Sequence, residues 1–142
     1  MAIRSGQTKV ALLAIRPEFA LQILGGYKKV EFRKRSFAAR VSHVAIYAGR
    51  PVKAVVGYFD VTRVVEDSPR NLWKRYGRIG GIGKDEFDMY FQSCERGVAI
   101  GVGKVQTLRK ALPLEAFARS MRPPQSFLYL SRQEFRRIRE NS

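Results

Sequence analysis

The sequence predicts an α+β fold in a single domain. Segments with the alternating pattern of β-strands recur along the chain, and short segments of unequal length with helix-start signals lie between them. This mixture favours α+β over a regular β-α-β series. With 142 residues, of which 45% are hydrophobic, the chain is long enough to bury its own core. No repeat, low-complexity tract or linker interrupts it, so residues 1–142 are predicted to form one domain.

The first predicted helix begins at Pro17 and ends at Gly25 and Gly26. Proline has the fixed φ angle that suits a first helical turn, and glycine tolerates the left-handed backbone that ends many helices. The apolar stripe between them consists of Ala20, Leu21, Ile23 and Leu24. These signals predict a helix of about two turns.

A strand rich in charged residues follows this helix without a spacer. From Tyr27 the pattern has a period of two, as in a strand. One predicted face carries Lys28, Val30 and Phe32, and the other carries Lys29, Glu31, Arg33 and Arg35. Glu31 and Arg33 would lie roughly 6.5 to 7 Å apart along their face, where they can pair or bracket a ligand. An ion pair on a strand surface is the simpler interpretation.

Three further strands are predicted from hydrophobic alternation. Residues 41–48 form the first, and a turn at residues 49–51 leads into a long strand over residues 52–65. Gly57 marks a bulge or bend within the long strand. The β pattern returns over residues 98–108.

Two helices are predicted between the long strand and residue 98. Ser68 and Pro69 form a helix start, and Gly77 ends that helix. The second helix covers about residues 84–93. The glycine-rich residues 77–83 between the two helices predict a mobile loop that could cover a cleft.

The C-terminal part is predicted to hold a short helix, a strand and a final helix. The short helix opens at Pro113 and ends near Met121, and a pair of prolines then enforces extended backbone before a strand at residues 126–130. Ser131 and Glu134 have the spacing of a capping box, which predicts a helix to about residue 140. This helix carries Arg132, Arg136, Arg137 and Arg139.

The charge of the chain predicts a polyanionic partner. Lysine and arginine number 27 against 12 aspartates and glutamates, which gives a net charge of +15. Nucleic acid fits this charge best, because cations that displace counterions from phosphates gain binding free energy. An anionic membrane is the alternative partner. Against it, the longest apolar run, residues 10–15, is too short to span a bilayer, and no basic amphipathic segment has a broad apolar face.

Location and cofactors follow from the N-terminus and from the cysteine and histidine counts. Residues 1–9 are polar and do not resemble a secretory signal, which predicts a cytoplasmic protein. A single cysteine, Cys94, excludes an intrachain disulfide. With one histidine besides, the usual zinc ligand sets cannot be assembled. The sequence thus identifies no cofactor, and a divalent cation such as magnesium would have to rest on oxygen ligands.

The pattern Gly26-x-Lys28-x-x-Glu31-x-Arg33 after the first helix resembles the signature of the activating signal cointegrator homology (ASCH) domain. The resemblance extends from about residue 9 to about residue 130. Its further segments, in order, are residues 44–48, residues 51–57, Ser68-Pro69 with Trp73, and residues 123–127. It implies a PUA-like fold, a small and partly open β-barrel flanked by several helices.

The resemblance implies an RNA-binding protein with a basic cleft for single-stranded RNA, and ribonuclease is its candidate activity. The implied catalytic residues are Lys53, Tyr47 and Ser126. The implied substrate-binding residues are Lys28, Glu31, Arg33, Arg35 and Arg50. The lysines can neutralise phosphate, Tyr47 can stack on a base or donate its hydroxyl, and Ser126 can hydrogen-bond phosphate. RNA cleavage also needs a general base, for which a lysine with a lowered pKa, a tyrosine or Glu31 are the candidates.

Two other functions compete with RNA binding. One branch of the family resembles an amidohydrolase that acts on acetylated cytidine through the motif lysine, a threonine three residues later and a distant glutamate. Here Glu31 stands at the threonine position, and the region expected to supply the glutamate is rich in glycine. Hydroxyl chemistry is therefore excluded at position 31. A non-enzymatic regulatory module of transcription or translation that docks on a protein is the other alternative.

Three remaining motifs are interpreted as structural. Residues 77–84 resemble a phosphate-binding loop, but Arg78 replaces a required glycine and Asp85 replaces the residue that would hold magnesium, which excludes a nucleotide triphosphatase. His43 has no evident serine or cysteine partner in the sequence and precedes an apolar strand, which favours a structural or surface histidine. Cys94 has no oriented base and is interpreted as a packing residue.

Overall fold

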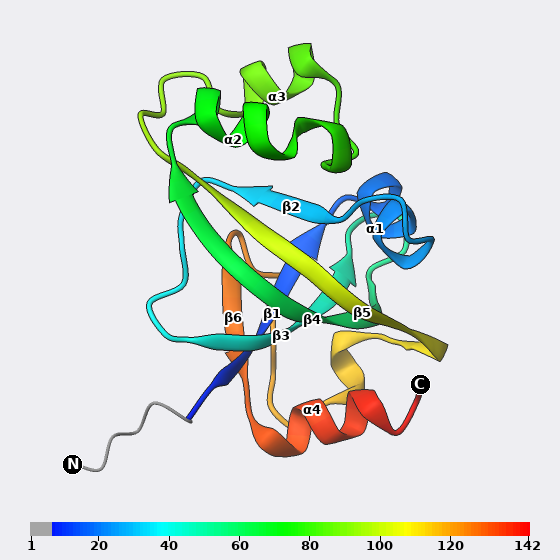
Figure 1. Cartoon of the computed structure of the whole chain (residues 1–142). Coiled ribbons are helices and arrows are strands. Elements are labelled where there is room, and N and C mark those ends of the chain that lie inside the picture. The colour runs from blue at the N-terminus through cyan, green and yellow to red at the C-terminus, as the bar shows by residue number, and fades with distance from the viewer. Residues whose placement is uncertain (1–6) are drawn as a thin grey trace, which may run out of the picture.

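The computed structural model describes residues 7–142, which form one six-stranded sheet with helices around it (Figure 1). The strands are β1 (Lys9–Ile15), β2 (Val30–Arg33), β3 (Val41–Ala48), β4 (Ala54–Asp67), β5 (Gly97–Leu112) and β6 (Phe127–Leu130). The α-helices are α1 (Pro17–Leu24), α2 (Pro69–Tyr76), α3 (Lys84–Tyr90) and α4 (Arg132–Arg139), and the 3-10 helices are η2 (Gly77–Ile79) and η3 (Leu114–Ala116).

The sheet is mixed and open. Its strand order is β2-β5-β4-β3-β1-β6, in which β1 and β3 pair in parallel and all other neighbours pair antiparallel. Because β2 and β6 are its two edges, the strands do not close into a barrel. This architecture confirms the predicted α+β class. No helix within residues 7–142 is long and apolar enough to cross a membrane.

Strand alternation in β1 and β3 divides the core between the two faces of the sheet. Leu13 and Ile46 belong to one cluster, which includes residues of α1. Leu12 and Tyr47 belong to the opposite cluster, which includes residues of α4. A side chain at position 47 therefore projects away from α1, because neighbouring strand residues point to opposite faces.

A third cluster places α2 and α3 over β2, at the top of Figure 1. Phe32 of β2 meets Phe87 of α3 edge to face, with ring centroids 4.9 Å apart, and Leu72 of α2 is fully buried beside them. Full burial of a phenylalanine or leucine stabilises the fold by about 1.5 to 3 kcal/mol. This packing holds α3 above the charged strand.

Several predicted local signals are confirmed. Gly26, after α1, has a φ of +84°, in the left-handed region. The Ser68 hydroxyl accepts a hydrogen bond from the backbone of Asn71 at the start of α2. Ser131 and Glu134 form both hydrogen bonds of the capping box at α4. The expected bulge at Gly57 appears as a register shift between β4 and β5, and a Cβ atom there would lie 2.6 Å from the Gln106 carbonyl oxygen.

The predicted helix from Pro113 to Met121 is wrong. Only the 3-10 helix η3 forms, and the backbone is already extended at Phe117, with φ −95° and ψ 154°. Arg119 is directed toward α4, where its Nε lies 2.6 Å from a carboxylate oxygen of Glu134. The burial of Leu114 and Phe117 and this ion pair stabilise a path that a continued helix could not follow.

Other differences concern boundaries and the glycine-rich segment. β4 begins at Ala54, two residues later than predicted, because Lys53 in the preceding turn has a φ of +54°. β5 continues to Leu112, and α3 ends at Tyr90. The glycine-rich segment begins as the 3-10 helix η2, and the Ile79 carbonyl accepts a hydrogen bond of 2.7 Å from the backbone of Lys29. The segment is thus attached to the residues that lead into β2.

Candidate functional site

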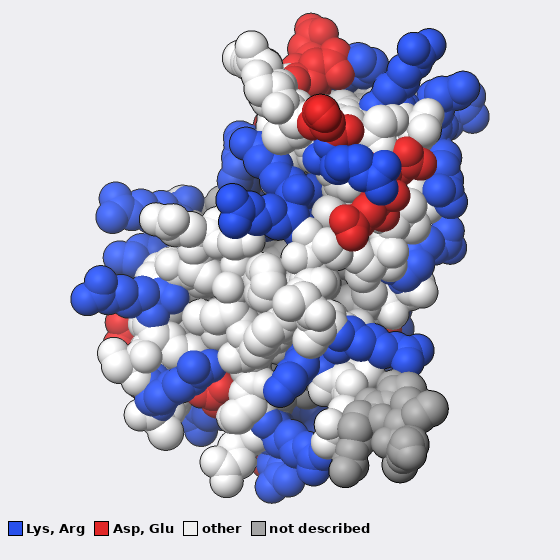
Figure 2. Space-filling model, turned by 90° about the vertical axis from the view of Figure 1, so that its left-hand side faces the viewer, with Lys and Arg blue, Asp and Glu red and all other residues white. Residues whose placement is uncertain are grey.

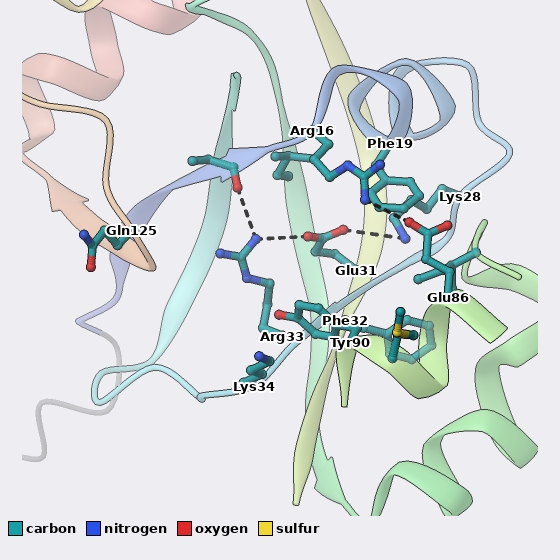
Figure 3. A pocket seen from close by; sticks show the side chains of 14 residues that line it. Arg16, Phe19, Lys28, Glu31, Phe32, Arg33, Lys34, Glu86, Tyr90 and Gln125 are labelled. Atoms are coloured by element: carbon teal, nitrogen blue, oxygen red, sulfur yellow. Dashed lines mark hydrogen bonds and ion pairs between the residues drawn. The ribbon is translucent and has the colours of Figure 1, made fainter. Parts of the chain in front are cut away.

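A pocket of about 560 Å³ lies beside β2, between the end of β1, the start of α1 and α3 (Figure 3). Charged and aromatic side chains dominate its lining. The lining residues are Ala14, Ile15, Arg16, Phe19, Lys28, Glu31, Phe32, Arg33, Lys34, Ile82, Glu86, Met89, Tyr90 and Gln125. The pocket therefore unites the signature residues with segments distant in the sequence.

Glu31 lies between two cations in this pocket (Figure 3). Its Oε1 lies 3.6 Å from the Lys28 ammonium nitrogen and its Oε2 lies 3.1 Å from Nη1 of Arg33. Arg33 also donates to the carbonyl oxygens of Ala14, at 3.2 Å, and Ser126, at 3.0 Å. The predicted Glu31–Arg33 pair is confirmed, but Glu31 is only 5% exposed, so the pair is not a strand-surface ion pair.

The predicted position of Lys28, on the face opposite Glu31, is wrong. β2 begins at Val30, so the alternation of the strand does not apply to Lys28. Its side chain is 2% exposed, and its ammonium group donates to the Gly80 carbonyl and lies 4.7 Å from the centre of the Phe19 ring. Burial lowers the pKa of Lys28, whereas the charges of Glu31 and Glu86 act in the opposite direction.

Helix α3 contributes a carboxylate that the sequence reasoning missed. Glu86 lines the pocket and pairs with Arg16 at 2.8 Å. The region in which a partner glutamate would be sought is rich in glycine, and Glu86 follows it within the first turn of α3. The packing of Phe87 on Phe32 brings this turn over β2. The sequence signal for this helix start was the pair Asp85 and Glu86, because acidic residues interact favourably with the positive N-terminal end of a helix dipole.

The aromatic wall of the pocket also comes partly from α3. Tyr90 lines the pocket, and the ammonium group of Lys34 lies 5.0 Å from the centre of its ring. Burial raises the pKa of Tyr90, so its hydroxyl keeps its proton at neutral pH. Phe19 and Phe32 complete the aromatic part of the lining.

The end of β1, Ala14 and Ile15, forms one wall of the pocket, here called the β1 wall. The three candidate catalytic residues do not line the pocket but lie around this wall. Ala14 of the wall pairs with Tyr47 of β3, and the pairing of Leu13 with Phe127 places Ser126 opposite Ala14 on the other side. Gly49 donates a hydrogen bond of 3.0 Å to the Ile15 carbonyl, which fixes the turn that carries Lys53 next to the same wall.

Tyr47 is the most constrained of these three residues. Its side chain is 3% exposed and belongs to the cluster that contains Leu114 and Phe117. Burial and the nearby charge of Glu115 raise the pKa of Tyr47, whereas Arg50 acts in the opposite direction. The Tyr47 hydroxyl therefore keeps its proton at neutral pH.

The eight predicted site residues thus divide into groups. Lys28, Glu31 and Arg33 converge in the pocket, and Ser126 lies outside the lining, where its carbonyl oxygen accepts a hydrogen bond from Arg33. Tyr47, Arg50 and Lys53 lie at the end of β3 and in the following turn, where Arg50 and Lys53 are exposed. Arg35 is exposed beyond the end of β2 and does not line the pocket.

The remaining polar groups offer weaker sites. His43 has Ser42 Oγ at 2.8 Å from its Nδ1 and Asp60 Oδ1 at 3.2 Å from its Nε2, and its ring lies 5.0 Å from that of Phe135. The serine partner missed in the sequence is its direct neighbour, but none of these residues lines the pocket. Within residues 7–142, no three His, Cys, Asp or Glu side chains are grouped in a way that could hold a metal ion.

Positive charge is spread over the molecule rather than confined to one cleft. Figure 2 shows a face on which basic side chains surround a central area without charge, while acidic side chains gather mainly in its upper part. The pocket itself contains four cationic and two acidic side chains. Its cations are Arg16, Lys28, Arg33 and Lys34, and its acids are Glu31 and Glu86. The pocket is thus only mildly basic.

Comparisons with known proteins agree with the signature. No family model matches the chain. The ASCH domain-containing ribonuclease of Zymomonas mobilis is 33% identical over 133 residues, which cover 92% of this chain and 90% of that protein. The crystal structure of ASCH from Zymomonas mobilis matches with a TM-score of 0.86 and 32% identity, over 93% of this chain and 94% of that chain.

A more distant structure shares only the fold. The N-terminal domain of Staphylothermus marinus McrB has a TM-score of 0.60 at 12% identity, over 96% of both chains. The likeness to the Zymomonas mobilis protein, in contrast, extends over nearly the whole sequence and the whole structure. The chain therefore belongs to the ASCH domain family and has its PUA-like α+β fold.

Proposed function

We propose that this protein binds single-stranded RNA, with one base in the pocket beside β2, and cleaves the strand at the neighbouring β1 wall. The observation that carries the proposal is the buried row Lys28–Glu31–Arg33 within a pocket that has aromatic walls, on a chain of net charge +15. The Zymomonas mobilis relative, a ribonuclease by name, supports an RNA substrate. The cytoplasm is the corresponding proposed location.

The form of the pocket favours an unpaired base. A volume of about 560 Å³ lies in the range of small-molecule sites and can hold one nucleoside. Bases within a duplex are stacked and paired, whereas those of a single strand can turn outward onto aromatic side chains and expose their Watson–Crick edges. Phe19, Phe32 and Tyr90 supply such side chains.

The RNA backbone would continue past Ile15 toward the turn after β3. Arg50 and Lys53 are exposed there, on a turn attached to Ile15 by a backbone hydrogen bond. Exposed cations bind phosphates without selecting a sequence, and they suit this part of the path.

Cleavage at this wall would follow transesterification. The 2′-oxygen attacks the adjacent phosphorus, the bond from phosphorus to the 5′-oxygen breaks, and the products are a 2′,3′-cyclic phosphate and a 5′-hydroxyl. Lys53 would stabilise the charge on phosphorus, and Ser126 would hydrogen-bond a phosphate oxygen. Tyr47, which keeps its proton, would donate to the leaving 5′-oxygen, and Glu115 beside it would accept the 2′-hydroxyl proton.

Prolonged incubation of end-labelled single-stranded RNA with the purified protein tests this function. Wild type should produce cyclic-phosphate ends, and Lys53→Ala should lose cleavage, whereas the control Lys104→Ala, at an exposed lysine of β5, should retain it. Parallel reactions with EDTA or magnesium decide whether a divalent cation is used. Cleavage that persists unchanged in Lys53→Ala would refute the assigned role.

An amidohydrolase is the second candidate, and the position of Glu86 favours it. Lys28 and Glu86 both line the pocket, as the acetylated-cytidine branch of the family requires, although Glu31 supplies no hydroxyl. Acetate release from acetylated cytidine, lost in Glu86→Gln, would support this function over RNA cleavage.

A protein-docking module would instead show RNA affinity no greater than its charge explains.

A further inference from the structure

We propose that the pocket selects bases that carry a ring N–H beside a carbonyl group, which are uracil and guanine, over adenine and cytosine. This inference rests on the proposed function, because it names the base that the pocket receives. It concerns specificity, which neither the buried ion pairs nor the net charge explains alone.

The selecting element is the order of hydrogen-bonding groups in the row. As a carboxylate, Glu31 can only accept hydrogen bonds, and it lies 3.1 Å from the Arg33 guanidinium group and 3.6 Å from the Lys28 ammonium group. Lys28 and Arg33 can only donate. The pocket thus presents a donor, an acceptor and a second donor, in that order (Figure 3).

The two flanking cations retain donors for a ligand. Lys28 has three N–H groups, of which the Gly80 carbonyl takes one and Glu31 faces another. Arg33 has five N–H groups, and three hydrogen bonds to Ala14, Glu31 and Ser126 use three of them. Both hydrogens of Nη1 are used, so the donors left over on Arg33 are Nε–H and one N–H of Nη2, and one N–H of Lys28 is left over as well.

Base chemistry then determines the preference. Uracil places a ring N–H between two carbonyl oxygens, the complement of donor, acceptor and donor. Guanine places a ring N–H beside one carbonyl and donates a second N–H from its amino group, so that Glu31 can accept both. Adenine and cytosine have an unprotonated ring nitrogen at this position, and a lone pair that faces a carboxylate is repelled and unpaired.

The rest of the pocket does not oppose this choice. Stacking on Phe19, Phe32 and Tyr90 stabilises any base to a similar extent, so it contributes affinity without sequence preference. A phosphate group is a poor occupant of the part of the pocket beside Glu31 and Glu86, because both carboxylates would repel it. A neutral base edge with both donors and acceptors fits the row better.

The test uses 2′-O-methyl RNA pentamers, which cannot be cleaved through the 2′-hydroxyl. The central residue is uridine, guanosine, adenosine or cytidine between pairs of cytidines, and Kd is measured with the wild-type protein. Uridine and guanosine should bind about fivefold or more tightly than adenosine and cytidine. Equal Kd values would overturn the inference and leave the proposed function standing, whereas no binding to any pentamer would overturn both.

Methylated bases provide a matched test on the unaltered protein. A central 3-methyluridine lacks the ring N–H and should lose the whole uridine advantage, whereas 5-methyluridine keeps that edge and should bind as uridine does. Equal binding of both methylated bases would refute the role of Glu31. Glu31→Gln supplies a second check, because an amide can both donate and accept, and the preference of uridine over cytidine should shrink in a folded variant.

Discussion

The ammonium nitrogen of Lys28 lies 3.6 Å from Oε1 of Glu31, and both side chains are almost completely buried. A buried cation without its carboxylate is costly, and removal of one partner of such a pair destabilises a protein by about 3 to 5 kcal/mol. The pair therefore organises the pocket, and loss of either partner alone would destabilise the fold.

The first prediction concerns this role of Glu31 in stability. Glu31→Gln keeps the shape of the side chain but removes the charge that compensates Lys28, so the melting temperature should fall by several degrees. Calorimetry measures it, and Glu95→Gln, at an exposed glutamate, is the control. If cleavage vanished in Glu31→Gln while melting temperature and RNA affinity stayed at wild-type values, Glu31 would be the general base instead of an organiser.

The second prediction follows from the lowered pKa of Lys28. Burial makes the folded protein bind a proton at Lys28 less tightly than the unfolded chain does. Between the lowered pKa and the ordinary value of 10.5, the unfolded state binds more protons, so the contribution of Lys28 to the free energy of unfolding increases with pH. Urea unfolding across this interval should show a smaller increase in Lys28→Met than in wild type. An identical pH dependence would contradict the prediction.

The third prediction concerns salt. A chain with net charge +15 should bind single-stranded RNA with a log–log salt slope of several units in magnitude, since about five phosphate contacts give a slope of about −3.5. Titrations at increasing salt concentration measure this slope. Lys53→Ala should lower affinity more than Arg139→Ala on α4, and equal losses would indicate attraction without a defined path. A slope near zero would exclude electrostatic binding.

The fourth prediction separates binding from cleavage at Tyr47. Tyr47→Phe removes the proposed proton donor but leaves the buried ring, so the cleavage rate should fall about a hundredfold or more while Kd changes little. Tyr27→Phe is the matched control, because Tyr27 is 80% exposed. Single-turnover cleavage and filter binding measure the two quantities. An unchanged cleavage rate would remove Tyr47 from the mechanism.

The fifth prediction concerns acid stability at α4. Burial alone would raise the pKa of Glu134, but hydrogen bonds from Arg119 and Ser131 lower it below its ordinary value of 4.5. The resulting stability is present above about pH 4.5 and is lost as the pH falls through the lowered pKa. Glu134→Gln should thus be less stable than wild type at neutral pH, with the difference shrinking in acid. Glu140→Gln, at the exposed end of the helix, is the control.

Much of the fold was predictable because its signals are local. Pro17 begins α1, Gly25 caps its end, and Ser131 with Glu134 starts α4, because each signal involves backbone groups only a few residues away. The segment after Pro113 was predicted as a helix and is not one, because its path depends on a contact of Arg119 with α4, fifteen residues along the chain. The intrinsic helix propensity of these residues carries no information about such a distant contact.

The candidate site shows the same division. The spacing of Glu31 and Arg33 predicted their pairing, since two residues of one strand face are neighbours whatever the fold. The burial of Lys28, the arrival of Glu86 over β2 and the position of Tyr47 across the β1 wall were decided by tertiary structure. They depend on which elements pack together: α3 on Phe32, the glycine-rich segment on Lys28, and β3 beside β1. Such packing arises from contacts between distant residues, and no pattern within one segment encodes it.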